Sequence, residues 1–509
     1  MRNSAREESL DRYTTIGAIS QKVRLASRRL TVPMAIVLAI EVAYLDFSQK
    51  TGAYALAMIG GSTCIALAIW SSRAIGLPLL PMMAVQNLLV YGIPIAAAHE
   101  NILSYPKEFV TSSGFEVLIF NIAMALSWWI AMHVFEPSRP VSFALQEVDK
   151  SGTKGLKQLG FSMLIGSTLF GVLQGLHLLD ALYLVIPSGA DSILNTLISV
   201  AVACGLFLVS MVIGSGGLSP TARFAFGALF TANTLISADG FLLGGAAANV
   251  ITVAIGLFWG GGKLPWRYLT VSILAISFLN IGKTTMRDRY WGNEDKPAIP
   301  VTIEKLPSIY AEWSEASYEA MLENNTQVHA TKGSDAAANK NQTLLDRIDN
   351  LQNMLFVIDA TRSDHVSLLH GATYSLIPPL LVPRVLWPDK PRSHEGQVLL
   401  NVHFGRQDLN STFTTYIAWG LLPEAYGNFG PVAGAIAIGV FLGVFFAWVE
   451  NFSAPKLIVS MEGFLCLCLL LSLMNSFEMV ASVFVTSTFQ SMIVIVAASY
   501  PFVHRTVTR

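Results

Sequence analysis

The chain has 509 residues, of which 53% are hydrophobic and only 13% are charged, and its mean hydropathy is +0.52. Soluble domains carry about 25% charged residues, so this composition excludes an ordinary soluble protein and predicts a polytopic membrane protein. The formal net charge is −1 and no basic face is evident, which excludes strong binding to nucleic acid.

The expected elements begin with a basic cytosolic tail over residues 1–30. Apolar runs of roughly 17 to 25 residues, the length that crosses a bilayer, follow it. Nine runs make up an expected transmembrane bundle over residues 31–283, namely 31–47, 53–70, 75–98, 114–134, 157–176, 192–214, 222–238, 240–259 and 266–283. Three more runs, 430–449, 457–475 and 479–500, lie in a C-terminal part over residues 431–509 that ends in a cytosolic tail. The sequence thus predicts an all-α fold of about twelve transmembrane helices.

The cations predict the orientation of these helices. With both termini inside, the tails and inner loops hold 18 Lys and Arg residues, whereas the short outer loops hold only Lys50 and Lys107. One helix more or fewer before residue 284 would invert this pattern. The large loop over residues 284–430, between the ninth and tenth helices, is therefore expected on the outer side.

Within the helices, two further features bear on packing and function. The Gly- and Ala-rich stretch 214–262 supplies small residues that let helices approach closely. Glu41, Glu116 and Asp180 fall near predicted helix ends, where we expect interfacial side chains. Because ionisable residues deeper in the membrane are scarce, the sequence argues against a transporter or pump.

The large loop has two parts of different composition. Residues 288–350 are polar and hold two helix-like patterns, one through Tyr310, Trp313, Tyr318 and Met321, and one from Leu344 to Leu355. These patterns predict a small helical cap. After Val357, the prolines at 378, 379 and 383 forbid one continuous helix, so we expect a broken segment at the outer membrane interface.

The proline-rich segment carries the residues most suited to chemistry. Arg384, Lys390 and Arg392 stand among prolines that stiffen the chain, with Arg362 before them and Arg406 after them. Arginine binds phosphate oxygens in pairs and lysine neutralises them as a point charge. Fixed cations also stabilise a pyrophosphate leaving group as its bond breaks. The segment therefore predicts a site for an anionic, diphosphate-bearing substrate.

An attacking hydroxyl would need a general base, and the sequence offers several without ranking them. The candidates are Glu424, His394, Glu395, Asp389 and His365. Metal use is not expected, because no pair of carboxylates or histidines stands at a convincing ligand spacing on one predicted element.

Three stretches carry a family resemblance. They are the run Val382–Pro391, the pair Thr414-Thr415, and the run Pro423–Gly430 that leads into a helix. In their order and in their position after the ninth helix they resemble the Wzy-type O-antigen and exopolysaccharide polymerases, which join oligosaccharide repeat units. The match covers roughly residues 357–450, and over the rest only the general multi-helix plan is similar.

The resemblance implies a glycosyltransferase of the C-type (GT-C-like) architecture in the bacterial inner membrane that uses no cofactor. Its donor and acceptor would be oligosaccharides linked to undecaprenyl diphosphate, joined at the outer face of the membrane, and a chain-length regulator protein is a further expected partner. Carried over, Arg384, Lys390 and Arg392 become diphosphate-binding candidates, with Arg362 and Arg406 beside them. Glu424 and Asn428 become candidates for the sugar-reacting site, and the catalytic set expected is Glu424, His394 and Arg384.

Two other functions remain open at this point. An O-antigen ligase shares the carrier, the compartment and the multi-helix plan. A flippase or exporter of the same lipids also suits twelve helices, although the two similar halves typical of transporters are not evident. The sequence does not specify the sugar, the linkage, the chain length or the oligomeric state.

Overall fold

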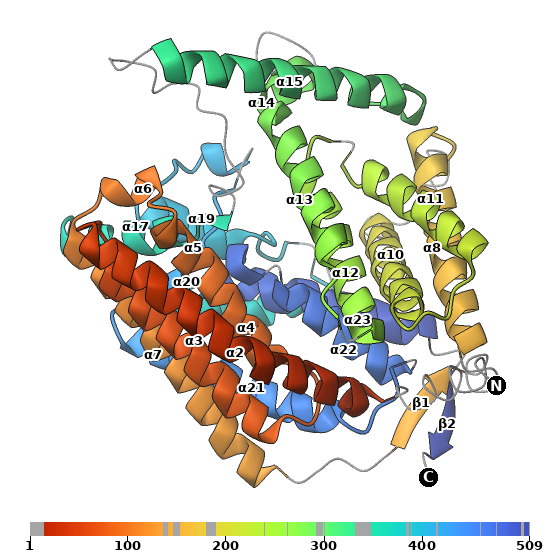
Figure 1. Ribbon diagram of the computed structural model, residues 1–509, viewed down its shortest axis with the longest axis horizontal. Coiled ribbons are helices and arrows are strands. Elements are labelled where there is room, and N and C mark those ends of the chain that lie inside the picture. The colour runs from red at the N-terminus through yellow and green to blue at the C-terminus, as the bar shows by residue number, and fades with distance from the viewer. Residues whose placement is uncertain are drawn as a thin grey trace. The chain divides into compact units, whose positions relative to one another are not determined.

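The structure is a computed structural model whose chain divides into two compact units (Figure 1). The terminal unit comprises residues 11–149 and 348–509, and the central unit comprises residues 1–10 and 150–347. The residues that the structure describes are 15–135, 141–145, 153–179, 190–238, 240–261, 263–291, 299, 301–330, 348–382, 386–387, 389–413, 416–458, 460–474, 476–499 and 503–507.

Four long helices form the main layer of the terminal unit: α2 (Ile16–Phe47), α3 (Ala53–Arg73), α7 (Lys107–Val134) and α21 (Ala433–Ser453). They pack in the order α2, α3, α7, α21 (Figure 1), so the helix after the large loop returns to lie against helices from the first quarter of the chain. The start of α2 is held by hydrogen bonds from Ile16 N to Lys456 O (2.9 Å) and from Gly17 N to Ala454 O (3.1 Å).

Small residues make the contact between α7 and α21 possible. Gly439 and Gly443 are spaced as in a GxxxG motif and face α7, where a Cβ added at Gly443 would lie 2.3 Å from the carbonyl oxygen of Met124. Membrane helices gain stability mainly from close packing, because lipid gives no hydrophobic drive between them. The sequence motif therefore serves a contact within the chain.

The third apolar run forms one continuous but irregular helix over residues 79–96. It comprises α4 (Leu79–Asn87), the π-helical turn η1 (Leu88–Gly92) and α5 (Ile93–Ala96). Pro94 has no N–H to donate and its ring crowds the preceding turn, and a π-helical turn accommodates such a residue without ending the helix. The turn carries Tyr91, whose hydroxyl accepts a hydrogen bond from Asn350 Nδ2 at 3.1 Å.

The remaining elements of the terminal unit are shorter than these four helices. They are α6 (Glu100–Leu103), α17 (Leu351–Arg362), η3 (Tyr374–Leu376), α18 (Ile377–Leu381), α19 (Glu395–His403), η4 (Ser411–Phe413), α20 (Leu421–Phe429), α22 (Met461–Met474), η5 (Ser476–Glu478) and α23 (Ala481–Ser499). Two strands, β1 (Val141–Leu145) and β2 (Val503–Val507), pair antiparallel with Val141 opposite Val507. This ribbon was not expected from the sequence.

The central unit is built from α8 (Thr153–Gly175), α10 (Ala190–Gly214), α11 (Pro220–Ile236), α12 (Leu243–Gly261), α13 (Trp266–Ile281), α14 (Lys283–Tyr290), η2 (Ile303–Lys305) and α15 (Leu306–Ala330). The close approach expected of the Gly- and Ala-rich stretch is confirmed between α10 and α12. A Cβ at Gly260 would lie 1.9 Å from the carbonyl oxygen of Met211, which leaves room for no larger residue.

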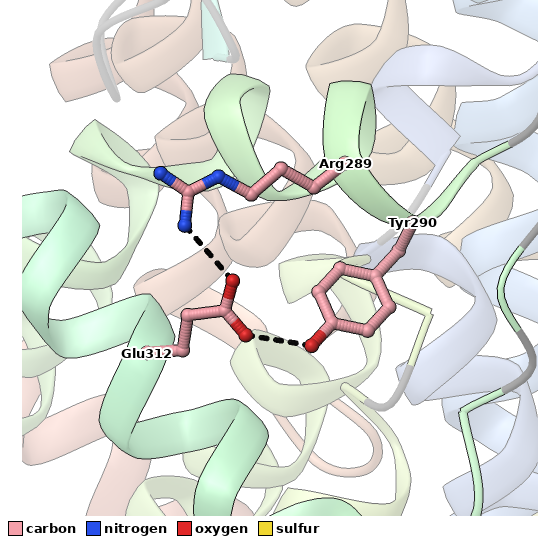
Figure 2. A network of polar contacts seen from close by, with 3 residues as sticks. All are labelled: Arg289, Tyr290 and Glu312. Atoms are coloured by element: carbon pink, nitrogen blue, oxygen red, sulfur yellow. Dashed lines mark hydrogen bonds and ion pairs between the residues drawn. The ribbon is translucent and has the colours of Figure 1, made fainter.

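Helices α13 and α14 are bent by 49° at Gly282, and α15 packs over the bend. The cluster that joins them consists of Phe241, Leu243, Met286, Ile309, Trp313 and Ala316. At its edge Glu312 accepts a hydrogen bond from Tyr290 Oη at 2.6 Å and pairs with Arg289 at 2.9 Å (Figure 2). These polar contacts thus hold the amphipathic helix α15 against α14 at the edge of the apolar cluster.

The helix expected through Tyr310 and Trp313 is confirmed as α15, but its apolar face differs from the expected one. Trp313 is fully buried, whereas Tyr318 and Met321 are 57% and 46% exposed. The buried face continues through the small residues Ala316 and Ser317 instead, because they allow α15 to approach the bend at Gly282.

The second pattern, expected as part of the cap, forms α17 from Leu351 onward and packs against α7 and α20 in the terminal unit. Leu344 and Leu345 lie outside the described residues. Pro378 and Pro379 stand in the five-residue helix α18, which confirms that the proline segment is broken.

Among the described residues, eight helices are long and apolar enough to cross a membrane, and the bent pair α13 and α14 would make a ninth. A multi-pass helical membrane protein is therefore confirmed. The last two apolar runs contain shorter helices, α22 and the described apolar part of α23 at residues 481–497. Helix α11, in the expected run 222–238, is not among the membrane-spanning candidates, so twelve spans remain a prediction.

Candidate functional site

The site centres on α20, a nine-residue helix whose first eight residues are all buried. Gly420 (φ 93°) and Gly430 (φ 79°) flank it in backbone conformations that other residues rarely adopt, which fixes where the helix begins and ends. Glu424 and Asn428 are four residues apart and therefore share one helix face. Asn428 Nδ2 donates to the backbone oxygen of Glu424 at 2.8 Å.

The carboxylate of Glu424 is completely buried and accepts two hydrogen bonds. Thr373 Oγ1 donates to Oε1 at 2.6 Å, and the backbone N–H of Ala481, the first residue of α23, donates to Oε2 at 2.5 Å. Burial raises the pKa of Glu424 from 4.5 to about 7, although both hydrogen bonds act to lower it. A carboxyl group with such a pKa can take up or release a proton near neutral pH.

The loop that brings Thr373 to Glu424 is held on the end of α20. The backbone N–H groups of Leu369 and His370 donate to the carbonyls of Gly427 and Asn428 at 3.0 and 2.9 Å. Gly371 N donates to Asn428 Oδ1 at 3.1 Å. These bonds satisfy carbonyls that a helix end leaves without partners, and they hold His370 in the uncommon region near φ 47°.

Asn428 completes the arrangement, because its Nδ2 also donates to Thr373 Oγ1 at 2.9 Å. Thr373, Glu424 and Asn428 therefore form one hydrogen-bonded group. Two of the residues expected from the sequence, Glu424 and Asn428, are brought together in this way. Thr373 and the Ala481 amide were not foreseen, since they lie far away in the chain and no local pattern indicates them.

The cationic segment is described in part. Arg384 lies outside the described residues, as do Thr414 and Thr415. Lys390 is buried, and its ammonium donates to the carbonyls of Leu380 and Val382 at 2.9 and 2.6 Å. The lysine thus holds residues 380 and 382 next to residue 390, and Arg384 lies between residues 382 and 390 in the sequence.

Arg392 and His394 lie just beyond that loop. Arg392 Nε bonds Glu395 Oε2 at 2.9 Å, its guanidinium stacks over Phe413 at 4.7 Å, and its buried Nη1 has no hydrogen-bond partner among the described residues. His394 stacks on Tyr416 at 4.5 Å, and its Nδ1 lies 2.8 Å from Gln397 Oε1. Arg392 therefore keeps a donor that an anion could use.

The two outlying arginines lie at α17, since Arg406 contacts this helix and Arg362 belongs to it. Arg406 Nη1 donates to Asn353 Oδ1 at 2.6 Å and its guanidinium lies over the Phe356 ring, while burial lowers its pKa. Arg362, the last residue of α17, donates to Ser112 Oγ at 3.1 Å. Neither bond involves Glu424.

Of the five base candidates, Glu424 differs from the others in its surroundings. His365 and Asp389 are exposed, Glu395 pairs with Arg392, and His394 is stacked. The carboxylate of Glu424 alone among the five is wholly buried next to neutral donors.

Besides Glu424, the described residues include four buried carboxylates, Glu116, Asp349, Glu450 and Glu462, of which Glu116 and Glu450 are the least exposed. Glu116 was expected at a helix end, but α7 begins seven residues earlier than predicted, so Glu116 is 2% exposed inside the unit and accepts from Val432 N at 3.0 and 3.1 Å. Asp180 lies outside the described residues.

Glu450, near the end of α21, accepts five hydrogen bonds from the indoles of Trp70 and Trp128 and from the amides of Ile75 and Gly76. A carboxylate has about four lone-pair positions. Glu450 is therefore saturated and holds helices together, whereas Glu424, with two donors, retains capacity for another group.

Comparison of the chain with protein-family models, curated proteins and solved structures finds no match. What the fold and the site define is a helical multi-pass membrane protein with a buried, hydrogen-bonded glutamate on a helix that does not span the membrane.

Proposed function

We propose that the protein is a glycosyltransferase that joins oligosaccharide repeat units carried on undecaprenyl diphosphate. The observation that carries this proposal is Glu424, a fully buried carboxyl group with a pKa of about 7 and unused acceptor positions. Such a group suits the removal of a proton from a sugar hydroxyl. The cationic segment just before it in the chain suits the diphosphate.

The proposed architecture has twelve spans and is of the C-type, with both termini in the cytosol and the loop 284–430 on the outer side of the bacterial inner membrane. Its support is that each of the twelve apolar runs contains a helix, and that Lys and Arg are concentrated on one side.

The proposed reaction is a single displacement. The acceptor hydroxyl oxygen bonds to the anomeric carbon of the donor glycan, and its proton passes to Glu424. The bond between that carbon and the phosphate oxygen breaks, and undecaprenyl diphosphate leaves with the electron pair. Arg384 and Arg392 stabilise the growing negative charge on the leaving group, and Lys390 joins the two ends of the segment in which Arg384 stands.

The test is an assay with the purified full-length chain and a defined undecaprenyl-linked oligosaccharide, with products separated on a gel. A ladder with single-unit increments is expected. Transfer of one finished glycan to another lipid would identify a ligase instead, and movement of the lipid across vesicles without a new glycosidic bond would identify a flippase.

Two variants connect the activity to these residues. Arg384→Ala is expected to lower turnover about 100-fold or more, and Glu424→Gln about 100- to 10,000-fold. The matched controls are Arg223→Ala and Glu319→Gln, which alter exposed residues of the central unit and should retain the ladder. Full polymer length in a folded Arg384→Ala protein would refute the assignment.

A further inference from the structure

The buried hydroxyl of Tyr374 takes no part in the hydrogen-bonded group formed by Thr373, Glu424 and Asn428. Tyr374 directly follows Thr373 and begins the short helix η3. Its ring stacks on Phe429 of α20 with centroids 5.4 Å apart. The hydroxyl oxygen is buried, and among the described residues no group forms a hydrogen bond with it.

An unpaired buried hydroxyl is uncommon in folded proteins, since it loses its bonds to water and gains none. Tyr374 lies near Glu424, because it directly follows Thr373, whose hydroxyl donates to that carboxylate at 2.6 Å. Burial, and then the charge of Glu424, raise the pKa of Tyr374 well above 10. Tyr374 therefore stays protonated and keeps an O–H donor.

Glu424 has hydrogen-bond acceptor positions that are not used. It accepts from Thr373 and from Ala481 N, which leaves about two of its lone-pair positions unused. A donor without an acceptor and an acceptor with spare positions thus occur in one buried place. A ligand hydroxyl satisfies both, because its oxygen accepts one hydrogen bond while its proton is donated.

Aromatic surface lies next to this pair. Phe429 stacks with Tyr374 on one side and is 40% exposed. The face of an aromatic ring is electron-rich and attracts the weakly positive edges of C–H groups. Sugars carry such C–H faces beside their hydroxyls, so the surroundings suit a sugar better than a simple alcohol or water.

We propose that Tyr374 and Glu424 together bind the attacking hydroxyl of a sugar acceptor, with Tyr374 Oη donating to its oxygen and Glu424 accepting its proton. This inference rests on the proposed glycosyltransferase function. It adds a binding residue and defines the acceptor subsite. In the reaction the tyrosine keeps its own proton and orients the oxygen, while the proton of the acceptor passes to Glu424 as the glycosidic bond forms.

The test is Tyr374→Phe in the full-length protein, which removes one oxygen atom and retains the stacked ring. With the acceptor unit varied at fixed donor concentration, kcat/KM is expected to fall roughly 5- to 100-fold. The dependence on donor concentration should be unchanged. The melting temperature should stay level or rise, because the variant no longer buries an unpaired hydroxyl.

The matched control is Tyr91→Phe, because the hydroxyl of Tyr91 does have a partner, Asn350 Nδ2 at 3.1 Å. That variant should lower the melting temperature and leave the acceptor dependence unchanged. A structural role for Tyr374 would instead lower the melting temperature of Tyr374→Phe and weaken donor and acceptor use together.

The outcomes separate the two proposals. An active wild type with equal kcat/KM in Tyr374→Phe overturns the acceptor subsite alone. A wild type that forms no glycosidic bond overturns the proposed function, and the subsite with it.

Discussion

Replacing Glu424 by glutamine should make stability less dependent on pH. The pKa of Glu424 is raised from 4.5 to about 7 by burial, so the folded protein binds this proton more tightly than the unfolded chain does. The folded state is therefore favoured by this group below pH 4.5. Stability is lost as the pH rises from 4.5 through about 7.

The size of the effect follows from the two pKa values. At 1.36 kcal/mol per pKa unit, the difference between 4.5 and about 7 corresponds to about 3 kcal/mol of stability lost at alkaline pH. About 2 kcal/mol of this arises between pH 5 and pH 8. Glutamine has the shape of the protonated acid, and its amide can still accept from Ala481 N while donating to Thr373 Oγ1. Glu424→Gln should thus remain folded and should not lose this stability at alkaline pH.

The assay is thermal unfolding of the purified protein in detergent, followed with a thiol-reactive fluorophore. Cys204, Cys466 and Cys468 are buried and form no disulfide among the described residues, so their labelling reports unfolding above the signal of the half-buried Cys64. The melting temperature of Glu424→Gln should exceed that of the wild type by a margin that grows from pH 5 to pH 8. The exposed control Glu319→Gln should show a constant margin. A margin that stays flat or shrinks for Glu424→Gln would refute the reasoning.

Two further predictions concern packing and the α14–α15 junction. Gly443→Ala places a Cβ 2.3 Å from the carbonyl oxygen of Met124 and should destabilise the protein by about 1 to 3 kcal/mol. The same change at Gly61, where no described atom lies within 4 Å, should be neutral or slightly stabilising in the same melting assay. Glu312→Gln should cost about 0.2 to 1 kcal/mol, because its contacts are partly exposed (Figure 2). Hydrogen bonds from Tyr290 and then from Arg289 lower the pKa of Glu312 from 4.5, so this cost should be present at neutral pH and shrink as the pH falls below 4.5. A cost that does not change with pH would contradict the assignment.

Much of the helical framework could be predicted because the signals for it are local. Each apolar run contains a helix, since hydropathy and run length are properties of neighbouring residues. The apolar face of α15 was less predictable. Its pattern pointed to Tyr318, but the approach of α15 to Gly282 selected the small residues Ala316 and Ser317 for the buried side.

Only those residues of the candidate site that lie within one short motif could be predicted from the sequence. The family resemblance of the run Pro423–Gly430 nominated Glu424 and Asn428 together, whereas the short helix α20 that brings them onto one face was not expected. Thr373 and Ala481 come from positions 51 and 57 residues away from Glu424. No periodicity connects such distant positions.

By itself, the sequence determined that this is a multi-pass helical membrane protein with clustered cations beside a proline-broken segment, because composition, run length and charge do not depend on the fold. Only the tertiary structure decided the states of Glu116, Glu424 and Glu450. Glu116 binds a single amide, Glu450 is saturated by indoles and amides, and Glu424 keeps unused positions in a fully buried place. The physical reason is that burial and hydrogen bonding of a carboxylate are set by neighbours from remote parts of the chain.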